Sequence, residues 1–199
     1  MKIFTVRHGQ THWNTEGRIQ GHTDIELDEV GIAQAARLGT RLADEKVDII
    51  YTSDLSRAAK TAEIINSHHN VELVTTLALR ETSFGIYEGQ LYEEIYDEMR
   101  HHHNTGYPVP GGESVQDYFS RIHAFLDEMV TKHYQNIIIV GHFGTVRAAI
   151  CYFLQIPPEE RERFYIGNTA VHCFERGDDG KFYMILENDT SHLNVGEIA

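Results

Sequence analysis

The sequence has few cysteines and prolines, and no long hydrophobic run. Its 199 residues include only 2 Cys and 4 Pro. Cys151 and Cys173 are too few for a disulfide framework and lack metal-ligand spacing, so we expect reduced thiols. No segment approaches the ~20 apolar residues that a membrane-spanning helix needs. The first residues become polar too early for a secretion signal, and we therefore expect a cytoplasmic protein with no membrane partner.

Basic residues are also scarce, with 17 Lys and Arg against 30 Asp and Glu and a net charge of −13. Nucleic acids and anionic membranes are bound through basic surfaces, so this balance argues against both as partners. Charges more than roughly 8 Å apart are largely screened at physiological salt. A local group of arginines could therefore still bind a small phosphorylated metabolite.

Strand-like and helix-like segments alternate through the chain without an internal repeat or a break in composition. This alternation predicts one domain over residues 1–199, built as a three-layer α/β/α sandwich with a mostly parallel central sheet and an antiparallel edge strand. We expect strands over 2–6, 47–52, 71–74, 136–142, 170–175 and 182–187. We expect helices over 29–43, after 53–54, over 91–101, from Ser114 and over 144–154. The last two strands read as an edge hairpin, which makes a homodimer a reasonable expectation.

Histidines, arginines and one glutamate lie where the expected strands finish. Arg7 and His8 end the first strand, and His142 ends the apolar run NIIIVGH. Arg57 falls in the first turn of the helix after the second strand, and Glu81 in the loop after the third. Ligands of open α/β sheets bind outside the carboxyl ends of the strands. We therefore expect these five side chains to surround one phosphate-binding site.

Each of these residue types suits a step of phosphoryl transfer. Much of an imidazole is uncharged and nucleophilic near neutral pH, so His8 is the candidate nucleophile. Arg7 and Arg57 offer planar forks of donors for phosphate oxygens, and His142 can donate one more hydrogen bond. Glu81 can protonate the leaving oxygen and later accept a proton from water. Arginine and imidazole supply the countercharge, so we expect no metal and no cofactor.

Six blocks of sequence occur in order along nearly the whole chain. They are RHGQTHWN at 7–14, GRIQG at 17–21, YTSDLSRAAKTAEII at 51–65, LRE at 79–81, VGHFG at 140–144 and NDTSHLN at 188–194. Together they resemble the histidine phosphatase (phosphoglycerate mutase-like) superfamily, and the last block resembles the tail of its bacterial broad-specificity phosphatases.

The resemblance implies roles for matching positions. His8 would carry the phosphoryl group, Glu81 would be the proton donor, and Arg7, Arg57 and His142 would form the phosphate pocket. The backbone N–H of the residue after His142 would also face the anion, although a phenylalanine stands there where many relatives have glycine. The remaining residues implied at the pocket are Asn14, Gln20, Gly21 and Phe143, with His22 and His192 as candidates for the substrate wall.

The activity has a main reading and two alternatives. Family mutases grip a carboxylate and exclude water with extra basic residues after the glutamate block, whereas the variable, substrate-facing segment 82–113 has a single basic residue, Arg100. This favours a phosphomonoesterase for small metabolites over a phosphoglycerate mutase, the first alternative. The second is a phosphate-binding module without turnover, which the intact set of candidate residues disfavours. Glu88 and Glu113 remain alternative proton donors.

The run His101–His103 does not suggest a metal site. Adjacent helical residues point in different directions and cannot all face one ion. We expect a solvated surface there, with a role in the substrate pocket or in metal binding as the alternative.

Overall fold

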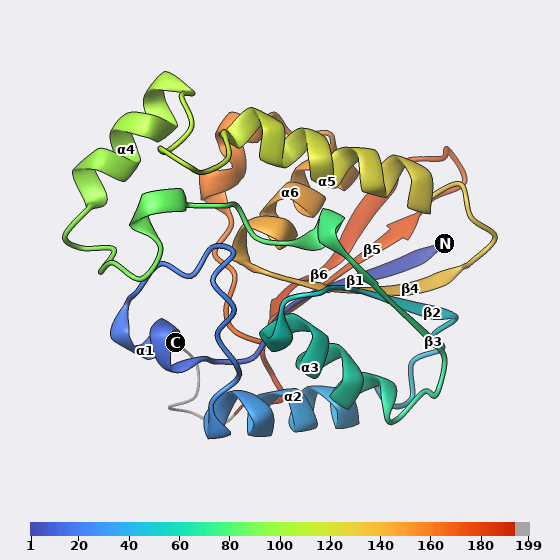
Figure 1. Cartoon of the computed structure of the whole chain (residues 1–199). Helices are drawn as coiled ribbons and strands as arrows, with labels where there is room; N and C mark the ends of the chain where they lie inside the picture. Colours follow the sequence, from blue (N-terminus) through green and yellow to red (C-terminus); the bar gives the residue numbers. More distant parts are fainter. Residues whose placement is uncertain (194–199) are drawn as a thin grey trace.

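A six-stranded sheet forms the centre of the molecule in the computed structural model (Figure 1). The structure describes residues 1–193, without the side chains of His103 and Asn104. Asn194 of the tail block and the end of the expected 1–199 domain lie outside the described residues. The strands run in the order β3-β2-β4-β1-β5-β6. Their bounds are β1 Lys2–Arg7, β2 Ile49–Ser53, β3 Glu72–Thr76, β4 Asn136–Gly141, β5 Val171–Arg176 and β6 Phe182–Asp189.

The sheet is mostly parallel, as expected. β1, β2, β3 and β4 are parallel to one another, whereas β5 is antiparallel to both β1 and β6. The run NIIIVG of β4 is apolar because both of its faces are covered. The edge strand β6 alternates half-buried and exposed residues instead.

Helices cover both faces of this sheet, giving the three expected layers. α2 and α3 lie on one face, and α5 and α6 on the other (Figure 1). The side chains of Asp28 and Ser114 cap α2 and α5 at their N-termini. The α-helices are α1 His12–Glu16, α2 Glu29–Leu42, α3 Ser56–Asn66, α4 Tyr96–Thr105, α5 Val115–Met129 and α6 Phe143–Leu154, and the 3₁₀ helices are Leu77–Leu79, Gly85–Tyr87 and Pro158–Arg163.

Two local predictions were inaccurate, both outside the sheet. The helix expected over 91–101 begins at Tyr96, because Leu91 forms a β-bridge and residues 92–95 form turns, and it continues to Thr105. The short helix α1 was not expected at all. Thr11 and Asn14 form a reciprocal capping box at its start, which is a detectable signal in the sequence T-H-W-N.

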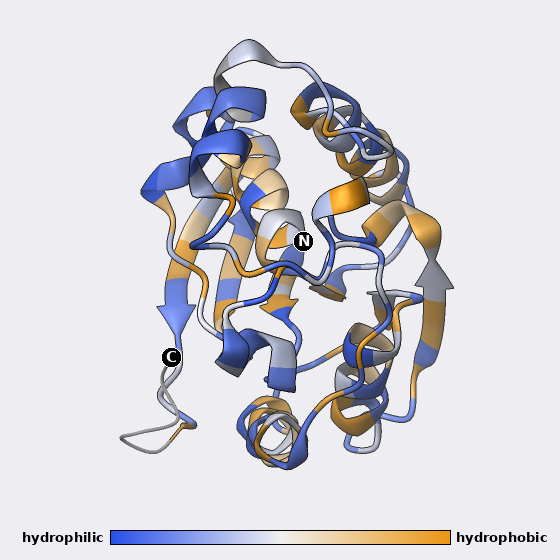
Figure 2. Ribbon diagram, turned by 60° about the vertical axis from the view of Figure 1, so that its left-hand side comes forward, coloured by the Kyte–Doolittle hydropathy of each residue, from blue (hydrophilic) through white to orange (hydrophobic). Residues whose placement is uncertain are grey.

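Apolar side chains gather between the layers, as the hydropathy colours in Figure 2 show along the strands. One buried cluster lies beneath α5 and α6, and a second lies beneath α2 and α3. Within residues 1–193, no helix is long and apolar enough to cross a membrane. The packed layers hold the strand ends in fixed positions, and the loops after those ends carry the polar site.

Candidate active site

The parallel pairing of β1 with β4 brings two histidines to the same edge of the sheet. Arg7 is in register with Gly141, and these are the last residues of β1 and β4. His8 and His142 are therefore the first residues after the two strands. The backbone N–H of His8 donates to the carbonyl of Gly141 over 2.9 Å. The ring centroids of the two histidines are 5.2 Å apart, with an interplanar angle of 63°. Both rings are buried.

One nitrogen of His8 is committed to the backbone, which fixes the chemistry of the other. His8 Nδ1 lies 2.7 Å from the carbonyl oxygen of Gly9. A carbonyl oxygen only accepts, so Nδ1 carries the proton of the neutral ring and Nε2 carries the lone pair. Burial, followed by the charges of Arg57 and Arg7, lowers the pKa of His8 well below its usual value. The ring is therefore neutral and nucleophilic at neutral pH.

Two arginines bring positive charge to these histidines. Arg57, in the first turn of α3, is 1% exposed, and its terminal nitrogens donate to the carbonyls of Gly21 and Thr23. Arg7 donates from Nη1 to the carbonyl of Ile166 over 2.8 Å. Burial lowers the pKa of each arginine to about 10, so both stay charged at neutral pH. Backbone carbonyls thus orient the guanidinium groups without neutralising them.

Several buried nitrogens at this point have no hydrogen-bond partner among the described residues. They are Nε of Arg7, Nε of Arg57 and both ring nitrogens of His142. Burying an unpaired donor costs about 1–3 kcal/mol, and more when the group is charged. Clustered around the His8 ring, these groups have the composition of a phosphate site. Arginine has no lone pair to offer a metal, and the described residues include no group of three or more His, Cys, Asp or Glu side chains that could hold one.

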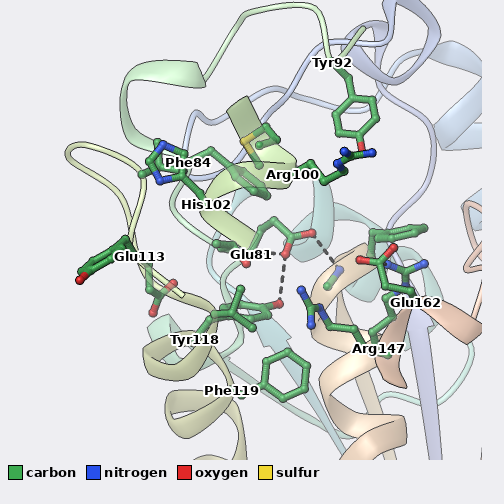
Figure 3. A pocket seen from close by; sticks show the side chains of 18 of the residues that line it. Glu81, Phe84, Tyr92, Arg100, His102, Glu113, Tyr118, Phe119, Arg147 and Glu162 are labelled. Carbon is green, nitrogen blue, oxygen red and sulfur yellow. Dashed lines mark hydrogen bonds and ion pairs between the residues drawn. The ribbon is translucent and has the colours of Figure 1, made fainter. Parts of the chain in front are cut away.

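Glu81 is held at the border of the site by three different segments. Its Oε1 accepts from the backbone N–H of Thr82 and from the hydroxyl of Tyr118, and its Oε2 accepts from the N–H of Gly144. The Tyr118 hydroxyl is also 3.1 Å from Thr145 Oγ1. Figure 3 shows the carboxylate pointing between these partners into a cavity. A fixed carboxylate beside the phosphate pocket is the arrangement that proton transfer to a leaving group needs.

The two alternative glutamates have other partners. Glu88 accepts from the backbone of His22, Thr23 and Phe84 and from the Thr23 hydroxyl, and it lines neither cavity of the site. Glu113 forms a two-pronged ion pair with Arg121. Glu81 is the one of the three that borders the phosphate pocket.

The position of Glu88 also explains why residue 21 is a glycine. This glycine has a φ of +55°, and a Cβ there would come within 2.3 Å of the Glu88 carboxylate. The turn at 20–23 therefore passes close to Glu88, and its carbonyls hold Arg57. Glu88 is thereby a positioning residue of the phosphate pocket.

Two adjoining cavities make up the site. The smaller, about 340 Å³, is lined by Arg7, His8, Asn14, Gln20, Gly21 and Arg57, together with neighbours from α1. The larger, about 680 Å³, opens beside it between α4, α5 and α6 (Figure 3). Glu81, Phe84, Tyr92 and Phe143 line both. A phosphate at His8 would thus have its leaving group in the larger cavity, with Glu81 between them.

The remaining predicted residues fall into two groups. Asn14 and Phe143 line the small cavity, and the Phe143 ring lies 5.4 Å from the Arg7 guanidinium. His22 and His192, by contrast, are not among the described residues that line either cavity. His22 Nε2 binds the backbone carbonyl of Glu81, and His192 Nε2 lies 3.0 Å from Thr169 Oγ1. Their expected place in the substrate wall stays a prediction, and in this structure one ring nitrogen of each histidine contacts a protein oxygen.

Sequence reasoning missed two arginines in the larger cavity, Arg147 and Arg161. Segment 82–113 supplies only Arg100, but α6 and the following 3₁₀ helix bring these two further arginines to the same cavity. The signal was present, because Arg147 is the one charged residue of the apolar helix FGTVRAAICYFL. Tyr118 was missed for a different reason, since a buried tyrosine in an amphipathic helix reads as core.

Known proteins are similar to this chain in sequence and in fold. Residues 3–190 match the histidine phosphatase superfamily (branch 1). Phosphoglycerate mutase-like protein 4 of Arabidopsis thaliana is 36% identical over 203 residues, which cover 96% of this chain and 86% of the relative. Phosphoserine phosphatase 1 of Hydrogenobacter thermophilus is 31% identical over 204 residues, or 97% of this chain and 94% of the relative.

A solved structure extends the comparison to three dimensions. The alpha-ribazole phosphatase from Shigella flexneri superposes with a TM-score of 0.87 at 26% identity, covering 96% of this chain and 97% of that one. Residues 3–190, which match the family, contain the carboxyl ends of all six strands. This chain belongs to the histidine phosphatase superfamily.

Proposed function

We propose that this protein is a phosphomonoesterase for small phosphorylated metabolites, working through a phosphohistidine at His8. The observation that carries the proposal is the set of unpaired buried nitrogens of Arg7, Arg57 and His142 around a neutral His8 ring. Relatives named as phosphoserine and alpha-ribazole phosphatases support the same reaction class.

In the first step, Nε2 of His8 attacks phosphorus, a P–N bond forms and the P–O bond to the leaving group breaks. Charge on the equatorial oxygens is met by Arg7, Arg57 and His142. The proton of a neutral Glu81 carboxyl passes to the leaving oxygen. Tyr118 and the N–H of Gly144 keep that carboxyl at the border of the two cavities.

In the second step, water attacks the phosphorus from the side that the alcohol has left. Glu81, now a carboxylate, takes a proton from the water as the P–N bond breaks, and phosphate leaves with His8 neutral again. The enzyme thus returns to its starting state, and water is the only reactant besides the ester.

Water access favours hydrolysis over the mutase alternative. Three tyrosines that line the larger cavity are well exposed, with Tyr92 50%, Tyr96 46% and Tyr107 73% accessible. A mutase has to keep water from its phosphohistidine until the second hydroxyl attacks. An open mouth of this kind supports transfer to water.

The decisive experiment is ³¹P NMR on one sample containing the protein, p-nitrophenyl phosphate, 3-phosphoglycerate and a trace of 2,3-bisphosphoglycerate. We expect inorganic phosphate to accumulate, and His8→Ala to abolish it. Accumulation of 2-phosphoglycerate with little free phosphate would establish the mutase instead. Phosphate release that survives His8→Ala would refute the phosphohistidine mechanism.

A further inference from the structure

The larger cavity combines aromatic walls with positive charge at its base. Phe84, Tyr92 and Tyr96 line it from the variable segment, and Phe119 and Phe143 from α5 and α6. Arg147 and Arg161 line the same space. A volume of about 680 Å³ exceeds what a three-carbon leaving group fills, and aromatic walls suit a flat apolar body.

Arg147 is fixed in place mainly by backbone and aromatic contacts, and its ion pair with the exposed Glu162 is a long one. Its Nε donates to the carbonyl of Phe164 over 2.7 Å, and its guanidinium lies 4.2 Å from the centre of the Phe143 ring. The side chain is only 15% exposed, and the nearest acid, Glu162, is 3.9 Å away, beyond hydrogen-bond distance. The terminal nitrogens of Arg147 make no hydrogen bond to the described residues. Figure 3 shows Arg147 and Glu162 together on the α6 side of the cavity.

Arg161 adds a second cation to this place. Its Nη1 donates to the carbonyl of Pro158, and it forms no ion pair with the described side chains. Burial lowers the pKa of both arginines, the charge of Arg161 lowers the pKa of Arg147 further, and Glu162 opposes both shifts. Two partly buried cations that repel each other are stabilised by an incoming anion.

We propose that Arg147 and Arg161 form a subsite for a carboxylate on the leaving group, so that the preferred substrates are phosphomonoesters of acidic aromatic or similarly flat alcohols. This inference rests on the proposed phosphatase activity. A carboxylate fits better than a second phosphate, because Glu81, Glu113 and Glu162 line the same cavity and would repel a dianion more strongly. Arg147 and Arg161 are accordingly specificity residues.

The test compares esters that differ in one group. 4-Carboxyphenyl phosphate and 4-carbamoylphenyl phosphate have nearly the same shape, but only the first carries the charge. We expect kcat/KM for the carboxylate to exceed that for the amide by about tenfold. Arg147→Gln and Arg161→Gln should each remove most of this ratio. Arg163→Gln is the matched control, since Arg163 lies in the same 3₁₀ helix, is exposed and lines neither cavity.

A charge reversal guards against a loss caused by misfolding. Arg161→Glu should turn the preference toward 4-(aminomethyl)phenyl phosphate, a gain that a damaged protein cannot produce. Equal kcat/KM for the acid and the amide, with both hydrolysed in a His8-dependent way, would overturn the subsite and leave the phosphatase intact. A preference for 1,4-phenylene bisphosphate over the carboxylate would overturn the choice of carboxylate. No hydrolysis of any ester would overturn the phosphatase and the subsite together.

Discussion

The carboxylate of Glu81 accepts a hydrogen bond from the backbone N–H of Gly144 over 3.0 Å. Gly144 is the second residue of α6, and His142 is the residue that caps this helix. The candidate acid is thus tied to the same helix start that presents the second histidine. This link makes Gly144 a position where an added side chain should disturb Glu81, although Gly144 has no catalytic group of its own.

Replacing Gly144 with alanine should displace Glu81. A Cβ at this position would come within 2.4 Å of Glu81 Oε1 and 3.0 Å of the Tyr118 hydroxyl. A shift of about 1 Å in a catalytic group can reduce the rate a hundredfold, so we expect kcat for alkyl phosphates to fall about tenfold to a hundredfold. Gly167→Ala is the control, since its Cβ would meet nothing closer than 3.5 Å. Equal kinetics for the two variants would show that Glu81 is not held as described.

Glu81→Gln should impair poor leaving groups far more than good ones. Glutamine cannot deliver a proton, so kcat/KM for alkyl phosphates should fall by about 10² to 10⁴. p-Nitrophenolate leaves without help, and its ester should give a rapid burst followed by slow turnover, because glutamine cannot take a proton from water. Rapid-mixing measurements across a series of leaving groups test this. A uniform loss with no burst would assign proton transfer to another group.

The strand ends could be predicted from the sequence because apolar runs fix them. The run before His142 is long and continuous, and the run before His8 ends abruptly at Arg7, so their common edge followed from parallel pairing alone. The side chains that line the larger cavity could not be predicted in the same way. Arg147 reaches it through the packing of α6 against the loop at 164, and the His22 ring contacts the backbone carbonyl of Glu81. Neither orientation is encoded in the local pattern, since both depend on contacts between segments far apart in the chain.

Glu88→Gln should weaken phosphate binding although Glu88 lies outside both cavities. The carboxylate accepts four hydrogen bonds from His22, Thr23 and Phe84, and an amide can accept at most two. The released turn carries the carbonyls that orient Arg57. We expect the Kd of inorganic phosphate, measured by calorimetry, to rise about tenfold. Glu93→Gln, an exposed replacement nearby, is the control, and a Kd unchanged in both variants would contradict the positioning role.

A buried histidine away from the site should make the protein sensitive to acid. His172 on β5 is fully buried, and burial lowers its pKa to about 4. In the unfolded chain a histidine binds a proton below about pH 6.5, whereas folded His172 stays neutral until about pH 4. Stability is therefore lost as the pH falls between these values, because the unfolded state binds the extra proton.

His172→Phe removes this group and should flatten the dependence of stability on pH. Between about pH 6.5 and 5, one such histidine costs about 2 kcal/mol of unfolding free energy. His8 and His142, whose pKa values are also lowered by burial, act in the same direction in both proteins, so the difference isolates His172. Urea unfolding at the two pH values measures it, with the exposed His133→Gln as the control. If His172→Phe loses as much stability on acidification as the parent protein, the folded His172 takes up its proton at the same pH as the unfolded chain.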